Sequence, residues 1–345
     1  MTDPMTDPIN APIAAPMTPS TTARPRDIDT ALLRSWPLPV PGNDADKEER
    51  GHVLVLGGSR DMPGAVILAA TAALRAGAGK LTIATGRSVA QLVALALPES
   101  RVIGLAETEA GGFTTDAVDT LDPLADKISA ILIGPGMQVE AATARLVHAL
   151  LPRLEDGCAR GEVRIVLDAN AMGAILYPPA GAAPFRFRQS VLVTPHAGEM
   201  AHLTGSTKDD ILAAPDRHAL DAAQRWNAVV ALKGARTVIA TPEGERWQHE
   251  GGNVGLATSG SGDVLAGIVA GLAARGADLA QAVGWGVALH ARAGEKLAER
   301  YGKLGYLARE LPEIIPALME QAAGDSADAA ARPSGSFAGG LRVER

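Results

Sequence analysis

The chain has 345 residues, of which 47% are hydrophobic, 21% are charged and 3% are aromatic, and its net charge is −7 at pH 7. This is the profile of a soluble globular protein with an aliphatic core, and the acidic balance without a basic run predicts no nucleic-acid binding. No signal peptide and no apolar run of membrane-spanning length is evident, so we expect no membrane contact and a cytoplasmic location.

Both ends of the chain have the composition of disordered segments. Residues 1–27 are rich in Pro, Thr and Ala, and residues 322–345 are similar in character. We therefore expect one folded domain over residues 28–321 between two flexible tails. The single cysteine, Cys158, lies in a polar stretch, which excludes an internal disulfide framework and favours a surface thiol without a catalytic role.

Short β-branched runs alternate with longer Ala- and Leu-rich segments between the tails. The short runs predict strands at residues 52–56, 80–85, 101–105, 130–133, 164–167, 191–193, 229–232 and 237–241. The longer segments predict helices at residues 65–76, 89–97, 142–151, 216–226, 264–274 and 279–300. Apolar strands that alternate with helices predict an α/β fold, in which helices cover both faces of a mostly parallel central sheet.

Unusual loops follow several of these strands. They contain glycine and polar residues and lie at residues 57–59, 134–136, 168–171, 194–199 and 233–237. In a parallel sheet the carboxyl ends of the strands meet at one edge, where ligands bind. We therefore expect these loops to form an active site at that edge.

The stretch 255–267 is the most informative part of the chain. Its Gly260-Ser261-Gly262 run comes directly before Asp263 and an apolar segment that holds Gly267 and Gly271. Small residues let backbone N–H groups face an anion, and a following helix adds the positive end of its dipole. An ordinary N-cap explains Asp263 but not the glycines, which weaken a helix and permit a close backbone approach. We interpret this stretch as a phosphate site.

Several common motifs are incomplete. The chain has no full Walker A, Rossmann or nucleophile-elbow pattern, and no Cys/His cluster has zinc spacing. These failures disfavour an ordinary P-loop NTPase, a dehydrogenase and a serine hydrolase. His202, His218 and His290 lie in helix-like stretches, and we interpret them as structural.

Side chains in the strand-end loops each allow two interpretations. His196 either bonds to a substrate or is fixed by the local backbone, and Glu199 either holds Mg²⁺ through water or begins a helix. Lys233 either reaches a nucleotide or is a solvated strand end. Asp168 and Asn170 form either a hydrogen-bonding or metal-supporting pair or a simple Asx turn.

Six motifs in a fixed order resemble the ADP-dependent NAD(P)H-hydrate dehydratase family of the ribokinase-like superfamily. They lie at residues 53–59, 133–136, 167–171, 194–199, 232–234 and 260–267. The resemblance implies a three-layer α/β fold and the repair of hydrated nicotinamide nucleotides, (S)-NADHX and (S)-NADPHX. In the implied reaction ADP phosphorylates the hydroxyl at C6 of the nicotinamide. Phosphate then leaves, which gives NAD(P)H, AMP and phosphate.

The same resemblance implies a role for each matching residue. Asp263 is the base that takes the hydroxyl proton, and we expect the helix N-terminus to lower its pKa and keep it ionised. The implied anion hole consists of Gly260, Ser261 and Gly262. The implied contacts to the hydrated dinucleotide are Ala65, Gly136, His196 and Asp263. The implied contacts to the adenine nucleotide are Lys233, Gly234, Ala235, Arg236, Thr237 and Gly262.

The resemblance also implies partners. Mg²⁺ would accompany the phosphates, and members of the family are commonly tetramers. The family usually has Thr where Ser261 stands, and the hydroxyl is kept. Many bacterial members carry an N-terminal epimerase domain that interconverts the R and S hydrates. About 50 residues precede the first of the eight predicted strands, so we expect the epimerase to be a separate protein.

The sequence leaves other functions open. An ATP-dependent alcohol kinase of the vitamin-precursor type would share the Gly-Ser-Gly-Asp loop but not residues 57–59 together with 194–199. A non-catalytic nucleotide-binding protein with this fold would lack the base, whereas Asp263 is present. The preference for NADHX or NADPHX stays open, and ADP is favoured over ATP only by the resemblance.

Overall fold

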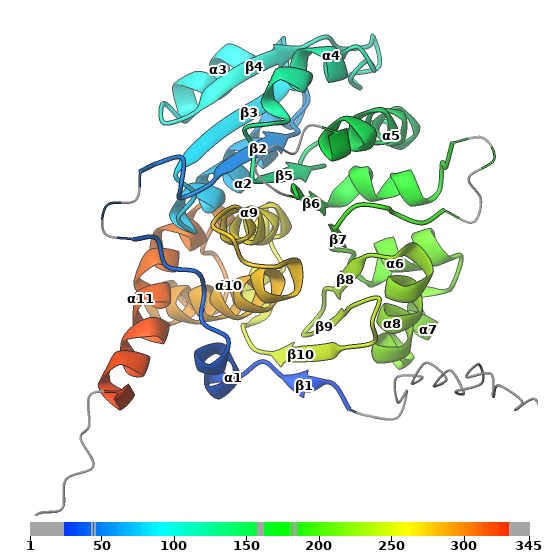
Figure 1. Ribbon diagram of the computed structural model, residues 1–345. Coiled ribbons are helices and arrows are strands. Elements are labelled where there is room, and N and C mark those ends of the chain that lie inside the picture. The colour runs from blue at the N-terminus through cyan, green and yellow to red at the C-terminus, as the bar shows by residue number, and fades with distance from the viewer. Residues whose placement is uncertain are drawn as a thin grey trace, which may run out of the picture.

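The computed structural model describes residues 24–42, 44, 46–156, 162–179, 181 and 185–330, without the side chains of 323–330. Cys158 lies outside the described residues. Ten strands form one sheet in the order β1-β10-β9-β8-β7-β6-β5-β2-β3-β4 (Figure 1). The strands are β1 (Arg26–Asp27), β2 (His52–Leu56), β3 (Lys80–Gly86), β4 (Arg101–Leu105), β5 (Ala130–Ile133), β6 (Arg164–Leu167), β7 (Val191–Val193), β8 (Val229–Leu232), β9 (Arg236–Ala240) and β10 (Arg246–Glu250). All neighbouring strands are parallel except where β9 pairs antiparallel with β8 and β10.

Helices cover both faces of the sheet, with α2, α9, α10 and α11 on one side and α5, α6 and α8 on the other (Figure 1). The helices are α1 (Thr30–Ser35), α2 (Pro63–Arg75), α3 (Ala90–Ala96), α4 (Ala117–Leu121), α5 (Glu140–Asp156), α6 (Ala197–Thr204), α7 (Lys208–Ala213), α8 (Pro215–Trp226), α9 (Ser261–Ala274), α10 (Leu279–Tyr301) and α11 (Leu311–Ala330). Four short 3-10 segments are η1 (Asp122–Leu124), η2 (Ala169–Ile175), η3 (Val254–Leu256) and η4 (Ala308–Glu310). The predicted three-layer α/β arrangement is therefore confirmed.

The core consists of two apolar clusters separated by the sheet. Val53 and Val55 of β2 belong to the cluster under α2, α9 and α10. Leu54 and Leu56 of the same strand belong to the cluster under α5 and α8. Successive side chains of a strand point to opposite faces, so a strand that is covered on both faces must be apolar throughout. This requirement explains the unbroken apolar run from which the strand was predicted.

Helix α9 packs directly on the backbone of α2. A Cβ atom at Gly267 would lie 2.1 Å from the carbonyl oxygen of Ala69, and one at Gly271 would lie 2.4 Å from that of Ala73. These distances leave no room for a side chain. The predicted close approach of another backbone at both glycines is therefore confirmed, and it holds α9 against α2.

We expect Gly267→Ala to lower the free energy of unfolding by about 3 kcal/mol, because an added methyl group must displace backbone atoms of α2. The measurement is urea unfolding followed by circular dichroism. Gly64→Ala is the matched control, because Gly64 lies in the first turn of α2 and a Cβ there would meet nothing within 4 Å. An equal effect of the two substitutions would contradict the close packing.

The predicted elements agree with the structure at eight strands and six helices, with boundaries that differ by a few residues. The sequence missed the strands β1 and β10 and the helices α1, α4, α7 and α11. The ranges predicted as tails, 1–27 and 322–345, include β1 and the end of α11. Arg26 and Asp27 pair with Trp247 and Gln248 through the backbone, which needs no apolar pattern. At the other end, α11 continues to Ala330. Its buried residues follow a helical spacing and are Leu311, Ile315, Leu318 and Ala322.

The order of the strands places a switch point beside β2. This strand pairs with β3 on one side and with β5 on the other. The connection after β2 leads to β3, and the connection after β5 leads to β6 in the opposite direction. The loops after β2 and β5 therefore flank a crevice at the carboxyl edge of the sheet, the usual place for a ligand in such folds.

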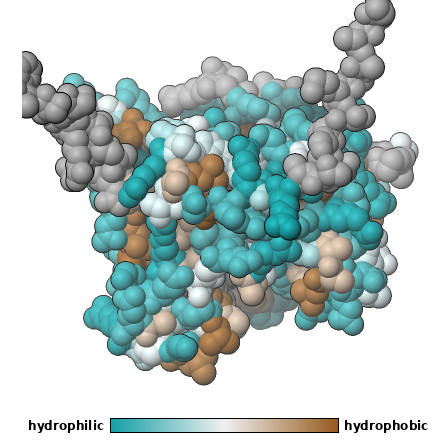
Figure 2. Space-filling model, turned by 90° about the horizontal axis from the view of Figure 1, so that it is seen from below, coloured by the Kyte–Doolittle hydropathy of each residue, from teal (hydrophilic) through white to brown (hydrophobic). Residues whose placement is uncertain are grey.

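Among the described residues, no helix is both long and apolar enough to cross a bilayer. On the face seen in Figure 2, hydrophilic residues predominate and hydrophobic ones lie in separate groups.

Candidate active site

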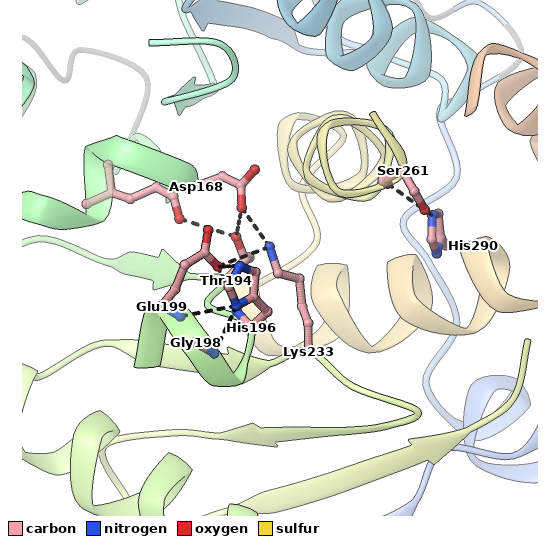
Figure 3. Close-up of polar contacts among 9 residues, drawn as sticks. Asp168, Thr194, His196, Gly198, Glu199, Lys233, Ser261 and His290 are labelled. Atoms are coloured by element: carbon pink, nitrogen blue, oxygen red, sulfur yellow. Dashed lines mark hydrogen bonds and ion pairs between the residues drawn. The ribbon is translucent and has the colours of Figure 1, made fainter. Parts of the chain in front are cut away.

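The glycine-rich and polar loops meet at one edge of the sheet. Strands β2, β5, β6, β7 and β8 are mutually parallel, so their carboxyl ends share this edge. The N-termini of α6 and α9 lie at the same edge (Figure 3). The predicted convergence of the strand-end loops is therefore confirmed.

Lys233, directly after β8, is the cation at the centre of this edge (Figure 3). Its Nζ lies 3.0 Å from Asp168 Oδ1 and 3.8 Å from Glu199 Oε2. The Thr194 hydroxyl donates to the same Asp168 oxygen at 2.6 Å. Burial lowers the pKa of Lys233, but the Asp168 and Glu199 carboxylates outweigh it and the net pKa is raised. Lys233 therefore stays protonated and is not a solvated strand end.

Asp263 lies half-buried in the first turn of α9. Burial raises its pKa to about 7, with the Asp168 carboxylate as the second cause. Lys233 and the Asp263 backbone N–H act in the opposite direction but do not cancel these effects. The expectation of a lowered pKa is therefore wrong, because loss of hydration and a like charge outweigh the helix N-terminus.

The N-terminal turn of α9 has unpaired backbone donors. Gly260 is the N-cap, has a φ of 89° and provides no side-chain cap. The Ser261 N–H donates to the carbonyl oxygen of Thr258 at 3.2 Å. Within the described part of the chain, the N–H groups of Gly260 and Gly262 donate to no carbonyl oxygen. The turn can therefore accept an anion on two N–H groups, next to the Lys233 ammonium.

His196 and Glu199 form a capping box at the start of α6. His196 Nδ1 accepts from the N–H groups of Gly198 and Glu199 at 3.0 and 3.1 Å. Glu199 Oε2 accepts from the His196 N–H at 2.7 Å. The local interpretation of each residue is thus observed, because His196 is fixed by the backbone and Glu199 lies in the first turn of a helix. Because Nδ1 accepts, a neutral ring carries its proton on Nε2, and the side chain is 59% exposed and free to meet a ligand.

Gly136 and Ala65 lie together across the switch point. A Cβ at Gly136, whose φ is +67°, would lie 2.9 Å from the Ala65 Cβ and 2.5 Å from the carbonyl oxygen of Met62. The neighbouring Gly58 N–H donates to the carbonyl oxygen of Pro135 at 2.6 Å. The loops after β2 and β5 therefore touch, and a ligand there meets backbone.

The segment from Lys233 to Thr237 consists of a connection of three residues after β8 and the first two residues of β9. Gly234 and Ala235 are exposed. The Arg236 guanidinium lies 3.2 Å from Asp216 and donates to Gln248 at 2.8 Å, so it already has protein partners. Thr237 is buried. Lys233, Gly234 and Ala235 are thus the parts of this segment that are open to a nucleotide.

A pocket of about 270 Å³ opens beside the capping box, and its lining includes Glu140, Asn170, His196 and His202. A larger hollow of about 650 Å³ lies at the amino ends of β7 and β8. We assign the ligand to the first region, because ligands of parallel sheets bind at the carboxyl ends of strands.

A family model for NAD(P)H-hydrate dehydratase matches residues 53–317, a range that contains every loop described above. The chain belongs to the NAD(P)H-hydrate dehydratase family. The resemblance seen in the six sequence motifs is thereby confirmed.

Individual family members agree with this assignment. The ADP-dependent (S)-NAD(P)H-hydrate dehydratase of Xanthomonas campestris is 46% identical over 87% of this chain and 98% of that protein. A bifunctional NAD(P)H-hydrate repair enzyme of Moorella thermoacetica is 40% identical over 84% of this chain, which spans only 53% of that longer protein. A Bacillus subtilis ADP/ATP-dependent NAD(P)H-hydrate dehydratase, crystallised with ATP and Mg²⁺, has a TM-score of 0.68 and 29% identity, covering 86% of this chain and 98% of that chain.

Two residues of this edge escaped the sequence analysis as site residues. Thr194 stands directly after β7, as Asp168 does after β6, and that shared position is the signal that could have found it. His290 was interpreted as structural, but its ring contacts Ser261 at the start of α9. The sequence holds no signal for that contact, because 29 residues separate the two.

Proposed function

We propose that the protein is an ADP-dependent (S)-NAD(P)H-hydrate dehydratase with its active site at the N-terminus of α9. The observation that carries the proposal is Asp263, a half-buried carboxyl with a pKa of about 7, beside unpaired N–H groups and Lys233. A carboxylate with a pKa near neutrality is suited to general base catalysis. Two N–H groups and a cation provide for the charge of a transferring phosphoryl group.

In the proposed reaction the C6 hydroxyl oxygen of the hydrate attacks the β-phosphorus of ADP. The bond from that phosphorus to AMP breaks, and Asp263 takes the hydroxyl proton. Loss of phosphate from C6 and of a proton from C5 then restores the double bond of NAD(P)H. Because ADP places charge on the phosphoryl oxygens, the N–H groups of Gly260 and Gly262 and the ammonium of Lys233 are positioned to stabilise it.

The remaining assignments follow the positions of the loops. We assign Ala65, Gly136 and His196 to the hydrated dinucleotide. Ala65 and Gly136 lie at the switch point, and His196 lies in the capping box. We assign the segment from Lys233 to Thr237 to the adenine nucleotide, with its exposed part, Gly234 and Ala235, as the contact surface.

The donor set fits Mg²⁺ that is carried mainly by the nucleotide. The described residues contain no group of three His, Cys, Asp or Glu side chains able to hold a metal. Asp168 Oδ2 and Glu199 Oε1 have no hydrogen-bond partner in the described part of the chain, and either can add one oxygen to phosphates and water. When bound, Mg²⁺ supplies positive charge against the phosphate oxygens.

The deciding experiment mixes the protein with (S)-NADHX, Mg²⁺ and ADP and follows the absorbance of reduced nicotinamide. Parallel reactions contain ATP or no nucleotide, and the products are analysed for AMP and phosphate. Recovery of NADH that requires a nucleotide supports the proposal. No recovery with either nucleotide contradicts it and favours the alcohol kinase, whose product would be a stable phosphate ester.

We expect kcat/KM to rise with pH through an apparent pKa of about 7, because Asp263 must lose its proton before it can act as a base. The measurement is the initial rate at low (S)-NADHX between about pH 6 and about pH 8 in buffers of constant ionic strength. A rate that is constant across this range would contradict the role of Asp263.

Other features of the proposal concern partners. Pairing with an epimerase would bring the R hydrate into the S form, and relatives named bifunctional repair enzymes are longer, because the match to this chain spans only about half of their length. A homotetrameric assembly and a cytoplasmic location stay predictions from the sequence. Gel filtration with light scattering tests the first.

A further inference from the structure

His290 is buried in the middle of α10, and its ring faces the first residue of α9 (Figure 3). Its Nε2 lies 3.0 Å from Ser261 Oγ and 3.1 Å from the carbonyl oxygen of Ser261. Both contacts reach the turn that we assign to phosphoryl binding. The ring therefore supports the site from behind.

The carbonyl contact determines which ring nitrogen carries the proton. A carbonyl oxygen can only accept, so Nε2 must be the donor. The opposite tautomer would place two lone pairs against each other at 3.1 Å. Burial lowers the pKa of His290 to about 4, so the ring is neutral at pH 7 and holds one proton, on Nε2.

This tautomer determines what the Ser261 hydroxyl can do. Because Nε2–H donates toward Ser261, its Oγ accepts from the ring and keeps its own proton for another partner. No other described residue accepts a hydrogen bond from this hydroxyl. The Ser261 N–H already donates to Thr258, so the hydroxyl is the group through which Ser261 can meet an anion.

We propose that His290 is a positioning residue, which holds the Ser261 hydroxyl as a hydrogen-bond donor to the phosphoryl group in transfer. The proposal rests on the proposed function of the α9 N-terminus. With Nε2 protonated, a lone pair of Oγ faces the ring and the O–H bond is directed away from it. With Nε2 unprotonated, the hydroxyl would donate to the ring. Its lone pairs would then face the phosphoryl oxygens and repel them.

Nitrogen NMR of protein with isotopically labelled histidine tests the tautomer without any activity measurement. The His290 signals are identified by their absence from His290→Gln. We expect a protonated Nε2 and an unprotonated Nδ1 at neutral pH. A protonated Nδ1, alone or together with Nε2, would overturn the proposal.

Steady-state kinetics with (S)-NADHX and ADP tests the consequence. We expect Ser261→Ala and His290→Leu each to lower kcat by about tenfold or more, with little change in the KM for (S)-NADHX, because a donor to developing charge is lost. The double variant should be no slower than Ser261→Ala, since the ring acts through the hydroxyl. His290→Gln keeps an N–H donor and should retain more activity than His290→Leu.

His148→Leu is the matched control. His148 lies on α5, across the sheet from α9 and α10, and its Nε2 is 2.9 Å from the carbonyl oxygen of Ala174. We expect kcat to be unchanged in this variant.

If the His290→Leu and Ser261→Ala effects multiply in the double variant, the proposal is overturned. Full kcat in His290→Leu with an impaired Ser261→Ala overturns this inference alone. Full kcat in Ser261→Ala likewise overturns this inference but not the proposed function, because the N–H groups of Gly260 and Gly262 are unchanged. The proposed function fails only if the wild type recovers no NADH. If His290→Leu does not fold, the tautomer of His290 in the wild type decides, and a protonated Nδ1 overturns the proposal.

Discussion

Replacement of Asp263 by Asn is expected to lower kcat for NADH recovery by about a thousandfold, within the range that a general base contributes. Asn keeps the shape of the side chain but cannot take the proton of the C6 hydroxyl. Binding should change little, so KM for (S)-NADHX should stay within a few fold. The measurement is the nucleotide-dependent recovery of reduced nicotinamide by purified variant and wild type.

The same variant should be at least as stable as the wild type at alkaline pH. The pKa of Asp263 is raised in the fold from 3.8 to about 7, so its ionised form is disfavoured there. The wild type therefore loses stability as pH rises from about 4 to about 7, and Asn at this position does not. Asp278→Asn, at the N-cap of α10, is the control and should keep full kcat. An active Asp263→Asn variant would remove this residue from its role.

Replacement of Lys233 by Met is expected to lower the free energy of unfolding by about 3 kcal/mol, because it leaves the buried Asp168 carboxylate without its cation. The side chains of Lys233 and Asp168 are only 18% and 5% exposed, so solvent screens the pair weakly. The measurement is urea unfolding at pH 7. Without the Lys233 charge the pKa of Asp263 should rise further, which moves the acid limb of the activity profile to higher pH.

Two comparisons separate the charge from the packing of this lysine. Lys296→Met removes an exposed partner of Glu299 at 2.9 Å and should change stability by less than about 1 kcal/mol. Asp168→Asn combined with Lys233→Met removes both charges and should restore part of the lost stability. A loss of the same size at Lys296 would show that the Lys233 effect does not arise from its burial.

The arrangement around Lys233 explains how one edge of the sheet can hold both a protonated lysine and a carboxyl group with a raised pKa. Its ammonium holds Asp168 and approaches Glu199, while Asp263 stays far enough into the low-dielectric interior to have a raised pKa. In the reaction that we propose, the site would therefore combine a cation for the phosphate oxygens with a base whose pKa is about 7.

Local pattern was enough for most of the sheet. Strands such as β2 and β5 contain short runs of apolar residues because both faces are covered, and such short runs between turn residues favour strands over helices. The sequence missed β10, whose Arg246 to Glu250 run is mostly polar and lies between β9 and the short edge strand β1. The sequence leaves a helix start at Glu199 as one of two interpretations, because the first turn of α6 depends on a capping histidine, a residue type that local rules seldom place there.

The sequence by itself determined the family, the three-layer α/β fold and the loops that form the site, because six motifs and a strand–helix alternation are local properties of the chain. Only the tertiary structure decided how the side chains in those loops behave. The pKa of Asp263 depends on burial and on Asp168, the charge of Lys233 depends on carboxylates 65 and 34 positions earlier in the chain, and the tautomer of His290 depends on a carbonyl of another helix. Hydration and charge act through space, so no sequence pattern records them.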